Sequence, residues 1–171
     1  VLPPAPFLQA TRDGEAVLTA AVLAGVDDAP RVADLFCGLG TFALPLAAQP
    51  SGALRRRVLA ADNARPAMAA LTAASRSAGL LLLPEPRVLF RRPLDVAELR
   101  RFVAVVVDAP RAGAAAQAAQ LAQSGVPRVI AVSCNPVSFA ADARTLVAGG
   151  YRLRRLTPVA QFRWSTHLEL V

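Results

Sequence analysis

Cys134 is the residue of this sequence that could act most directly as a nucleophile. It follows an apolar run, residues 128–133, and precedes Asn135 and Pro136. A thiolate at the end of a core strand can attack an electrophilic carbon when a nearby cation or a helix N-terminus lowers the pKa of the thiol. A buried core cysteine, the commoner fate of a single cysteine, is the alternative. Position alone leaves both interpretations open.

A glycine loop in the segment DLFCGLGT, residues 34–41, is a candidate ligand site. Gly38 and Gly40 can adopt a positive φ and let a ligand approach the backbone. The helix expected after this loop would point free N–H groups at that ligand. The loop also fits the dinucleotide pattern G-x-G-x-x-G/A, with Asp62 at about the distance of a ribose-binding acid. The loop is compatible with a site for a nicotinamide or flavin, with a site for S-adenosylmethionine, and with an ordinary strand–helix turn that binds no ligand.

Strand and helix patterns alternate along the chain. Continuous apolar runs are typical of strands buried on both faces, and the expected strands are residues 31–36, 57–62, 87–90, 102–108 and 128–133. Helices are expected at residues 16–24, closed by Gly25, and at residues 41–48, 66–77, 114–123 and 138–147. Residues 151–156 and 166–171 are expected to form an antiparallel pair, and residues 1–6 to be extended. The alternation predicts an α/β fold with a doubly wound, mostly parallel sheet.

Polar groups fall at the carboxyl ends of the expected strands, where such sheets bind ligands. They are Asp34 with its loop, Asp62, Asp108, Arg111 and Cys134. We therefore expect these groups to share one site. The aspartates could instead be turn or capping residues, and Arg111 could bind phosphate or solvent.

The length and composition indicate a globular protein. At 171 residues the chain is long enough for one domain with one core, and 54% hydrophobic residues argue against disorder. No apolar run approaches the roughly 18 residues needed to span a bilayer, so no membrane partner is expected. With two cysteines far apart and one histidine, neither a metal site nor an oxidising compartment is expected, which favours a cytoplasmic location.

The charge balance favours a polyanionic partner. The formal net charge is +7, and all 19 basic residues are arginine. Such a balance suits nucleic acid, and arginine forms the better fork for phosphates. A coding bias toward arginine and alanine is the alternative explanation.

Several motifs together, in order, resemble the catalytic domain of the RNA uracil-5 methyltransferase family, which uses S-adenosylmethionine. Residues 34–44 resemble its cofactor motif, and FLQ (7–9) resembles the segment before the cofactor strand. DAPRAG (108–113) resembles its Asp-Pro-Pro-Arg-x-Gly turn, and SCNP (133–136) resembles its nucleophile motif. Residues 161–169 resemble its end segment, which carries the general base. The resemblance spans nearly the whole chain. It implies a Rossmann-like class I S-adenosylmethionine-dependent methyltransferase fold over residues 1–171, without the family's N-terminal RNA-binding region.

The resemblance also implies a role for each matched residue. Cys134 would attack C6 of uracil, Glu169 would remove the C5 proton after methylation, and Arg111 would orient these groups. The positions that match cofactor contacts are Gln9, Phe36, Gly38, Gly40, Thr41, Asp62 and Asp108. The implied partner is RNA, and Leu39 and Thr41 favour the ribosomal-RNA branches over the transfer-RNA branch. No protein partner can be inferred.

The chain departs from the family pattern at several positions. They are Thr11 after FLQ, Ala109 after Asp108, and Ala160, Arg163 and Ser165 in the last segment. Changes around Glu169 motivate an alternative, a catalytically weakened module that binds S-adenosylmethionine or RNA. The glycine loop motivates a third hypothesis, a nucleotide-dependent oxidoreductase. The presence of both Cys134 and Glu169 favours a working enzyme.

Overall fold

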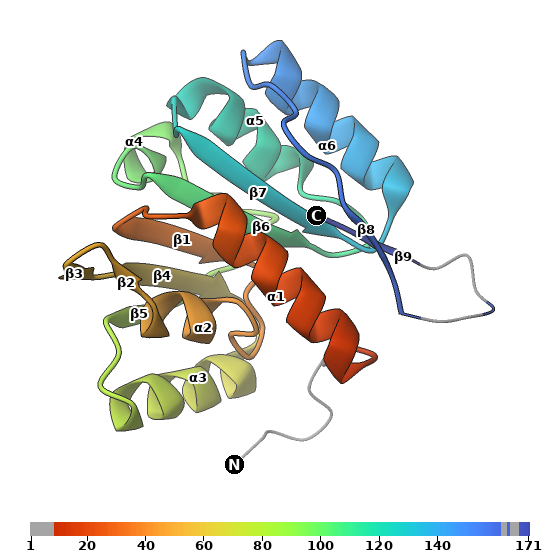
Figure 1. Cartoon of the computed structure of the whole chain (residues 1–171). Coiled ribbons are helices and arrows are strands. Elements are labelled where there is room, and N and C mark those ends of the chain that lie inside the picture. Colours follow the sequence, from red (N-terminus) through yellow and green to blue (C-terminus); the bar gives the residue numbers. More distant parts are fainter. Residues whose placement is uncertain (1–8, 162–163, 165–167) are drawn as a thin grey trace.

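A computed structural model of the chain describes residues 9–161, 164 and 168–171, and in this part strands and helices alternate (Figure 1). One sheet has the strand order β5-β4-β1-β6-β7-β9-β8. Its strands are β1 (Arg31–Leu35), β4 (Arg57–Asp62), β5 (Leu82–Pro86), β6 (Ala104–Ala109), β7 (Arg128–Ser133), β8 (Pro158–Ala160) and β9 (Leu168–Leu170). A separate hairpin pairs β2 (Pro50–Ser51) with β3 (Leu54–Arg55).

The sheet is mostly parallel. The five neighbouring strands β5, β4, β1, β6 and β7 run in the same direction, and β9 runs antiparallel to both β7 and β8. The pairing sets Leu35 beside Ala61 and Val107, and Ala109 beside Ser133. The carboxyl ends of four strands therefore meet at one edge, which confirms the predicted doubly wound sheet.

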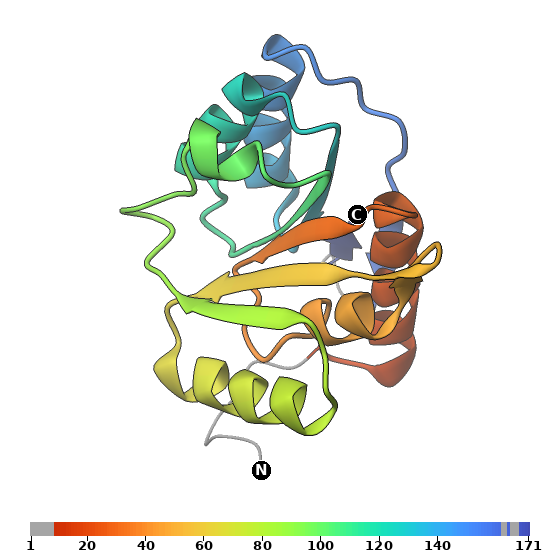
Figure 2. The same cartoon turned by 90° about the vertical axis from the view of Figure 1, so that its left-hand side faces the viewer.

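Helices cover both faces of the sheet (Figure 2). The helices α1 (Arg12–Val26), α2 (Ala43–Ala48) and α3 (Arg65–Ser77) lie on one face, and α4 (Val96–Leu99), α5 (Ala115–Ser124) and α6 (Pro136–Ala148) lie on the other. Each face has its own hydrophobic cluster, the first including Leu18, Leu46 and Leu71, the second Leu99 and Leu121. Both clusters take residues from β1 and β6, which accounts for the continuous apolar runs of these strands.

Helix α1 begins earlier than the hydrophobic pattern predicts. The Thr11 hydroxyl oxygen accepts a hydrogen bond from the Gly14 N–H at 3.0 Å and so caps the helix. The polar residues that follow Thr11 form the first turn, and Leu18, Val22 and Val26 form the buried stripe. Gly25 lies inside the helix, and Asp27 is the C-cap. The prediction of a C-cap at Gly25 was therefore wrong.

The third predicted strand was also wrong in position. The edge strand is β5, Leu82–Pro86, rather than residues 87–90. Its prolines are tolerated because an edge strand leaves alternate N–H groups without a ladder partner. Residues 87–90 instead enter a turn that Arg87 holds through both carboxylate oxygens of Glu98, at 2.7 and 2.8 Å.

The final antiparallel pair forms with a different first strand. Its members are β8 and β9, and residues 151–156 form no strand. Residues 166 and 167 of the expected last strand lie outside the described residues, as do residues 1–6. The β2–β3 hairpin and helix α4 had no counterpart among the predicted elements. Within the described part of the chain, no helix has the length and apolar character to cross a membrane.

Candidate active site

The loop after β1 has the tight, left-handed backbone that its glycines predict. Phe36, Gly38 and Gly40 have φ values of 61°, 52° and 90°. A Cβ at Gly40 would lie 2.5 Å from Cδ1 of Leu71 on α3, whereas a Cβ at Gly38 would meet no atom within 4 Å. Gly40 is therefore needed for packing, and Gly38 leaves open space beside the loop. Thr41 lies half-buried in the turn before α2.

Asp62, at the end of β4, joins this loop to the next strand. Its carboxylate accepts hydrogen bonds from the N–H of Gly38 at 3.0 Å and of Ala64 at 2.8 Å. The N–H of Phe36 also donates to the Ala61 carbonyl at 2.9 Å. The loop is thus held by β4, and Asp62 remains half-exposed with lone pairs left for another donor.

Carboxyl groups crowd this edge of the sheet. Asp34 is fully buried, and neither carboxyl oxygen has a hydrogen-bond partner among the described residues. Burial, then repulsion from Asp108 and Asp62, raise the pKa of Asp34 well above its ordinary value. Burial and repulsion from Glu169 and Asp62 raise the pKa of Asp108 from 3.8 to about 7. This crowding favours a bound cation.

Cys134 and Glu169 face each other across the last strands. Ser133 of β7 pairs with Leu170 of β9 in antiparallel register, which brings Cys134, in the bend after β7, toward Glu169 of β9. The two groups are close enough for the Glu169 charge to raise the pKa of the Cys134 thiol. Both side chains are half-buried. A thiol and a carboxyl therefore lie side by side at the edge that holds the aspartates.

Arg111 supplies positive charge to this pair. It is exposed on the turn after β6. Burial raises the pKa of Glu169, and the Arg111 guanidinium opposes that rise. Burial and the Glu169 charge raise the pKa of the Cys134 thiol, again opposed by Arg111. The structure thus brings Cys134, Glu169, Arg111 and Asp108 within electrostatic range of one another.

The N-terminal and C-terminal segments meet through Gln161. Its Nε2 donates to Oε1 of Gln9 at 2.9 Å, and its Oε1 accepts from the Thr11 N–H at 3.2 Å. A Cβ at Gly14 would lie 2.7 Å from the same oxygen. These bonds hold Gln9 against Gln161, which lies eight positions before Glu169 in the sequence. Residue types and spacing could not reveal this contact, which spans 152 positions.

Some positions of the expected C-terminal segment lie outside the described residues. Arg163, Ser165 and the residues between 165 and 168 are not described. Thr11, noted as a departure from the family pattern, serves as the α1 cap. The centroid of the Phe36 ring lies 5.3 Å from that of the Phe90 ring, a contact that the sequence did not predict. Among the described residues, no group of three or more His, Cys, Asp or Glu side chains could hold a metal ion.

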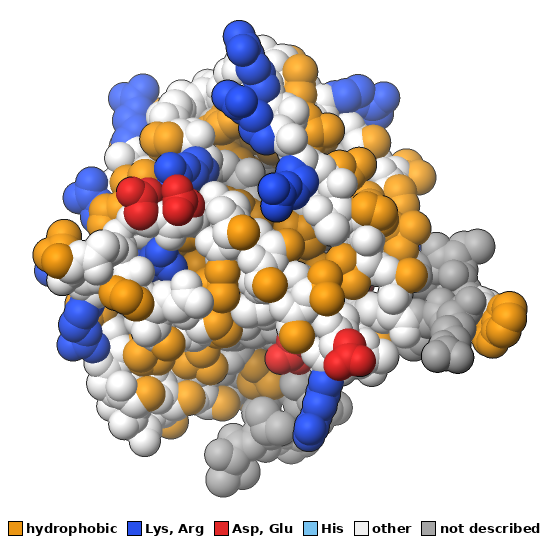
Figure 3. All heavy atoms as spheres, viewed as in Figure 1, with side chains coloured by type: hydrophobic (Ala, Val, Ile, Leu, Met, Phe, Trp, Pro, Cys, Tyr) orange, Lys and Arg blue, Asp and Glu red, His pale blue; other side chains and the backbone are white. Residues whose placement is uncertain are grey.

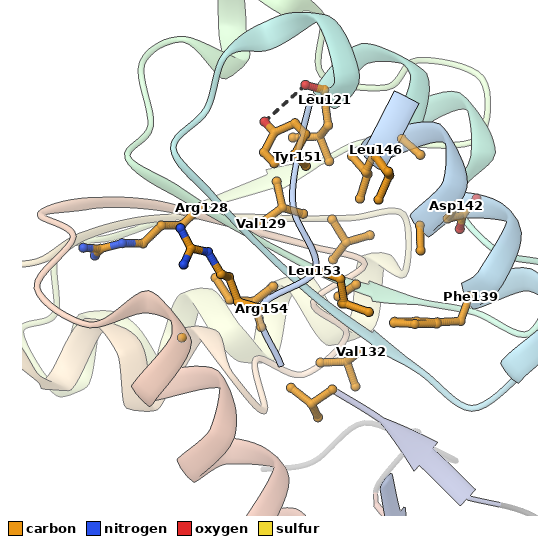
Figure 4. A pocket seen from close by; sticks show the side chains of 18 of the residues that line it. Leu121, Arg128, Val129, Val132, Phe139, Asp142, Leu146, Tyr151, Leu153 and Arg154 are labelled. Atoms are coloured by element: carbon orange, nitrogen blue, oxygen red, sulfur yellow. Dashed lines mark hydrogen bonds between the residues drawn. The ribbon is translucent and has the colours of Figure 1, made fainter. Parts of the chain in front are cut away.

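A large groove borders this edge of the sheet. It has a volume of about 930 Å³ and runs along β7 beneath the segment that leaves α6. Val129, Leu146 and Phe139 form its wall, and Leu153 and Arg154 lie over it (Figure 4). On this face, hydrophobic side chains lie exposed between arginines (Figure 3). Ala109 and Ser133, the neighbours of Asp108 and Cys134, are among its lining residues, whereas Cys134, Glu169 and Arg111 are not.

A comparison with protein families identifies the family of this chain. Residues 86–171, half of the chain, match the sequence profile of the tRNA (uracil-5-)-methyltransferase family. The chain belongs to this family. The matched part contains Asp108, Arg111, Cys134 and Glu169. Membership confirms the family that the motifs predicted.

Two curated relatives support the assignment. An uncharacterized RNA methyltransferase of Brucella melitensis is 50% identical over 172 residues, which cover 99% of this chain and 40% of that protein. The 23S rRNA (uracil(1939)-C(5))-methyltransferase RlmD of Pseudomonas fluorescens is 39% identical over 141 residues, covering 81% of this chain and 30% of that protein. The chain thus spans about 40% of the first relative's length.

Solved structures support the fold. A tRNA (uracil-54, C5)-methyltransferase from Pyrococcus abyssi, in complex with S-adenosyl-L-homocysteine, superimposes with a TM-score of 0.78 and 24% identity. The alignment covers 98% of this chain and 39% of that one. A ribosomal protein L11 methylase from Lactobacillus delbrueckii gives a TM-score of 0.61 at 16% identity. The fold is therefore the predicted class I S-adenosylmethionine-dependent methyltransferase fold.

Proposed function

We propose that this methyltransferase family member methylates C5 of a uracil in RNA through a covalent bond between Cys134 and C6 of the base. The observation that carries the proposal is the pairing of β7 with β9, which brings Cys134 close to Glu169. Both groups lie at the carboxyl edge of the sheet, within electrostatic range of Asp108. A nucleophile and a base are thus available to one flat ring at the edge where the fold binds ligands.

The reaction needs both groups because C5 of uracil is a poor nucleophile while the C5=C6 double bond is intact. The Cys134 sulfur bonds to C6, which makes C5 nucleophilic. S-adenosylmethionine, when bound, supplies an electrophilic methyl group. Glu169 then takes the C5 proton, and the electron pair of the broken C–H bond expels the Cys134 sulfur from C6. The ring regains its double bond, and the thiolate is regenerated.

Arg111 favours the charged form of both Cys134 and Glu169. Cys134 reacts as a thiolate, and the Arg111 guanidinium favours that form against burial and the Glu169 charge. Glu169 must accept a proton, and burial raises the pKa of its carboxyl, which makes it a better proton acceptor. We assign Arg111 to the stabilisation of both anions.

The residues at the glycine loop fit a cationic nucleoside cofactor. Asp34 is buried without a hydrogen-bond partner among the described residues, and the pKa of Asp108 is raised to about 7. A positive group nearby would relieve both. The open space at Gly38 admits a ligand close to the backbone. We propose that S-adenosylmethionine is held by Gln9, Phe36, Gly38, Gly40, Thr41, Asp62 and Asp108.

Ribosomal RNA is the substrate class that we favour. The relative from Pseudomonas fluorescens, named as a 23S rRNA methyltransferase, is 39% identical. The transfer-RNA enzyme from Pyrococcus abyssi is 24% identical. The net charge of +7, carried by arginines, suits an RNA backbone.

Transfer of a labelled methyl group from S-adenosylmethionine to unmodified ribosomal and transfer RNA tests this function. We expect 5-methyluridine in ribosomal RNA, with no product from the variant Cys134→Ser. Cys37→Ser is the matched control, because Cys37 is a buried thiol whose pKa burial raises far above its ordinary value. A Cys134→Ser chain that still makes 5-methyluridine would exclude the covalent mechanism. Cofactor binding without transfer would favour a binding module.

A further inference from the structure

Asn135 connects the turn that carries Arg111 to the turn that carries Cys134. Its Nδ2 donates a hydrogen bond to the Arg111 carbonyl oxygen at 2.9 Å. Its Oδ1 accepts from the Val137 N–H at 3.0 Å and caps α6. The two ends of one amide therefore bind two different segments. Capping requires only the oxygen, so the bond to Arg111 is an additional function of this side chain.

The backbone around Cys134 is anchored on both sides. The Asn135 N–H donates to the Ser133 hydroxyl at 3.2 Å. The hydroxyls of Ser133 and Ser138 both donate to the Asn135 carbonyl, each at 3.2 Å. Cys134 thus lies between two residues that bind each other, and a shift of Asn135 would move the backbone on either side of the sulfur.

The Arg111 turn is fixed to the same helix at a second point. The Ala114 N–H donates to Oδ2 of Asp142 on α6 at 2.7 Å. Gly113 has a φ of 81°, and a Cβ there would lie 3.0 Å from Cβ of Ser138. The far end of the turn is therefore packed tightly against α6. At the near end the link is the Asn135 amide, so this bond sets where the Arg111 backbone sits relative to Cys134.

We propose that Asn135 is a positioning residue, which holds Arg111 close to Cys134 and Glu169 by its hydrogen bond to the Arg111 carbonyl. This proposal rests on the proposed function and adds a residue to it. The charge of Arg111 opposes the rise in the pKa of both the thiol and the carboxyl, and that effect falls with distance. Loss of the Asn135 bond would therefore weaken the thiolate without removing any reacting group.

The variant Asn135→Ser separates positioning from capping. Serine caps a helix about as well as asparagine, and its hydroxyl is too short to replace the bond to Arg111. The measurement is the pH dependence of iodoacetamide alkylation of Cys134 in the Cys37→Ser background, without RNA or cofactor. We expect the alkylation midpoint to move to higher pH, in the same direction as in Arg111→Gln. We also expect kcat for methylation to fall by about tenfold, with little change in KM for S-adenosylmethionine.

The outcomes distinguish this proposal from the proposed function. An unchanged midpoint in Asn135→Ser, with a raised midpoint in Arg111→Gln, would overturn the positioning role and leave the methyltransferase proposal intact. Unchanged midpoints in both variants would also overturn the positioning role of Asn135. Should Asn135→Ser unfold, Asn135→Asp takes its place, because aspartate also caps well. Its lost donor and added charge would both raise the midpoint, so an unchanged value would again overturn the proposal.

Discussion

At the scale of single residues, Gly38 and Gly40 show that two glycines of one loop have different tasks. Both have a positive φ, but only Gly40 packs against a neighbouring helix. Gly38 instead borders open space and donates its N–H to Asp62. Gly40 is needed to fold the loop, and we assign Gly38 to the approach of the cofactor.

Replacing each glycine by alanine should therefore have a different result. Gly40→Ala adds a strained φ and a clash with Leu71, and we expect it to lower the free energy of unfolding by about 2–4 kcal/mol. Gly38→Ala adds only the strained φ, about 1 kcal/mol, but should weaken S-adenosylmethionine binding. Urea denaturation and calorimetry measure the two effects. Equal destabilisation by both substitutions would contradict this division.

Asp108 should make the stability of the unliganded chain depend on pH. Its pKa is raised from 3.8 to about 7 by burial and by Glu169 and Asp62. Between these values the folded chain retains a proton that the unfolded chain loses, so stability falls as the pH rises through this window and levels above it. We expect the variant Asp108→Asn to lose less melting temperature between pH 5 and pH 8. Parallel curves for the variant and the parent chain would refute a raised pKa at Asp108.

Much of the site could be predicted from residue types at strand ends, because parallel strands bring these ends together. Asp34, Asp62, Asp108, Arg111 and Cys134 were expected at one edge, and the structure places them there. The contacts of Gln161 and Asn135 were not predicted. They depend on side chains that meet only after the chain has folded, and no local pattern encodes such a meeting.

At the scale of elements, the buried strands were predicted well and the edge elements poorly. β4 and β7 have the predicted bounds because their apolar runs are continuous. The predicted position of β5 was wrong because its prolines obscure the pattern of an edge strand. The start of α1 is set by the Thr11 cap and its last turns by packing, so hydrophobic periodicity alone gave bounds that were too short.

A buried arginine should matter to how these elements join. Arg56 is 1% exposed and donates to the carbonyl oxygens of Asp27, Ala29 and Leu46 at the ends of α1 and α2. We expect Arg56→Ala to lower the free energy of unfolding by about 3 kcal/mol, because it leaves buried carbonyls without a donor.

The neighbouring Arg57 is the control for this substitution. It is exposed and starts β4, so Arg57→Ala should change the free energy of unfolding by less than about 0.5 kcal/mol. Urea denaturation of both variants compares them. A loss in Arg56→Ala as small as that expected for Arg57→Ala would show that the Arg56 hydrogen bonds contribute little.

At the scale of the whole molecule, the family profile, the strand order and the site agree. The sheet order β5-β4-β1-β6-β7-β9-β8 brings the last strand of the chain between β7 and β8. This insertion lets Glu169 reach Cys134, although the two are 35 positions apart in the sequence. The family motifs named Cys134 and Glu169 as candidates, but β8 was misplaced because residues 151–156 have the apolar content of a strand without forming one.

The cofactor should stabilise the whole domain if its site is the carboxyl edge of the sheet. At a concentration 100 times its dissociation constant, S-adenosylmethionine should add about 2.7 kcal/mol to the free energy of unfolding. Differential scanning fluorimetry would show this as a higher melting temperature, reduced in Asp62→Ala. NAD in place of S-adenosylmethionine should have no effect, and stabilisation by NAD alone would revive the oxidoreductase hypothesis.

The most direct test of the account is the reaction of this chain with a 5-fluorouridine RNA and S-adenosylmethionine. After Cys134 adds to C6 and C5 is methylated, C5 carries fluorine in place of the proton that Glu169 would remove, so the adduct persists. We predict a protein–RNA species stable to denaturation, with the RNA attached to the peptide that contains Cys134, and none with Cys134→Ser. Methylation of normal uridine RNA by Cys134→Ser at the parent rate, or an adduct at another residue, would contradict the account.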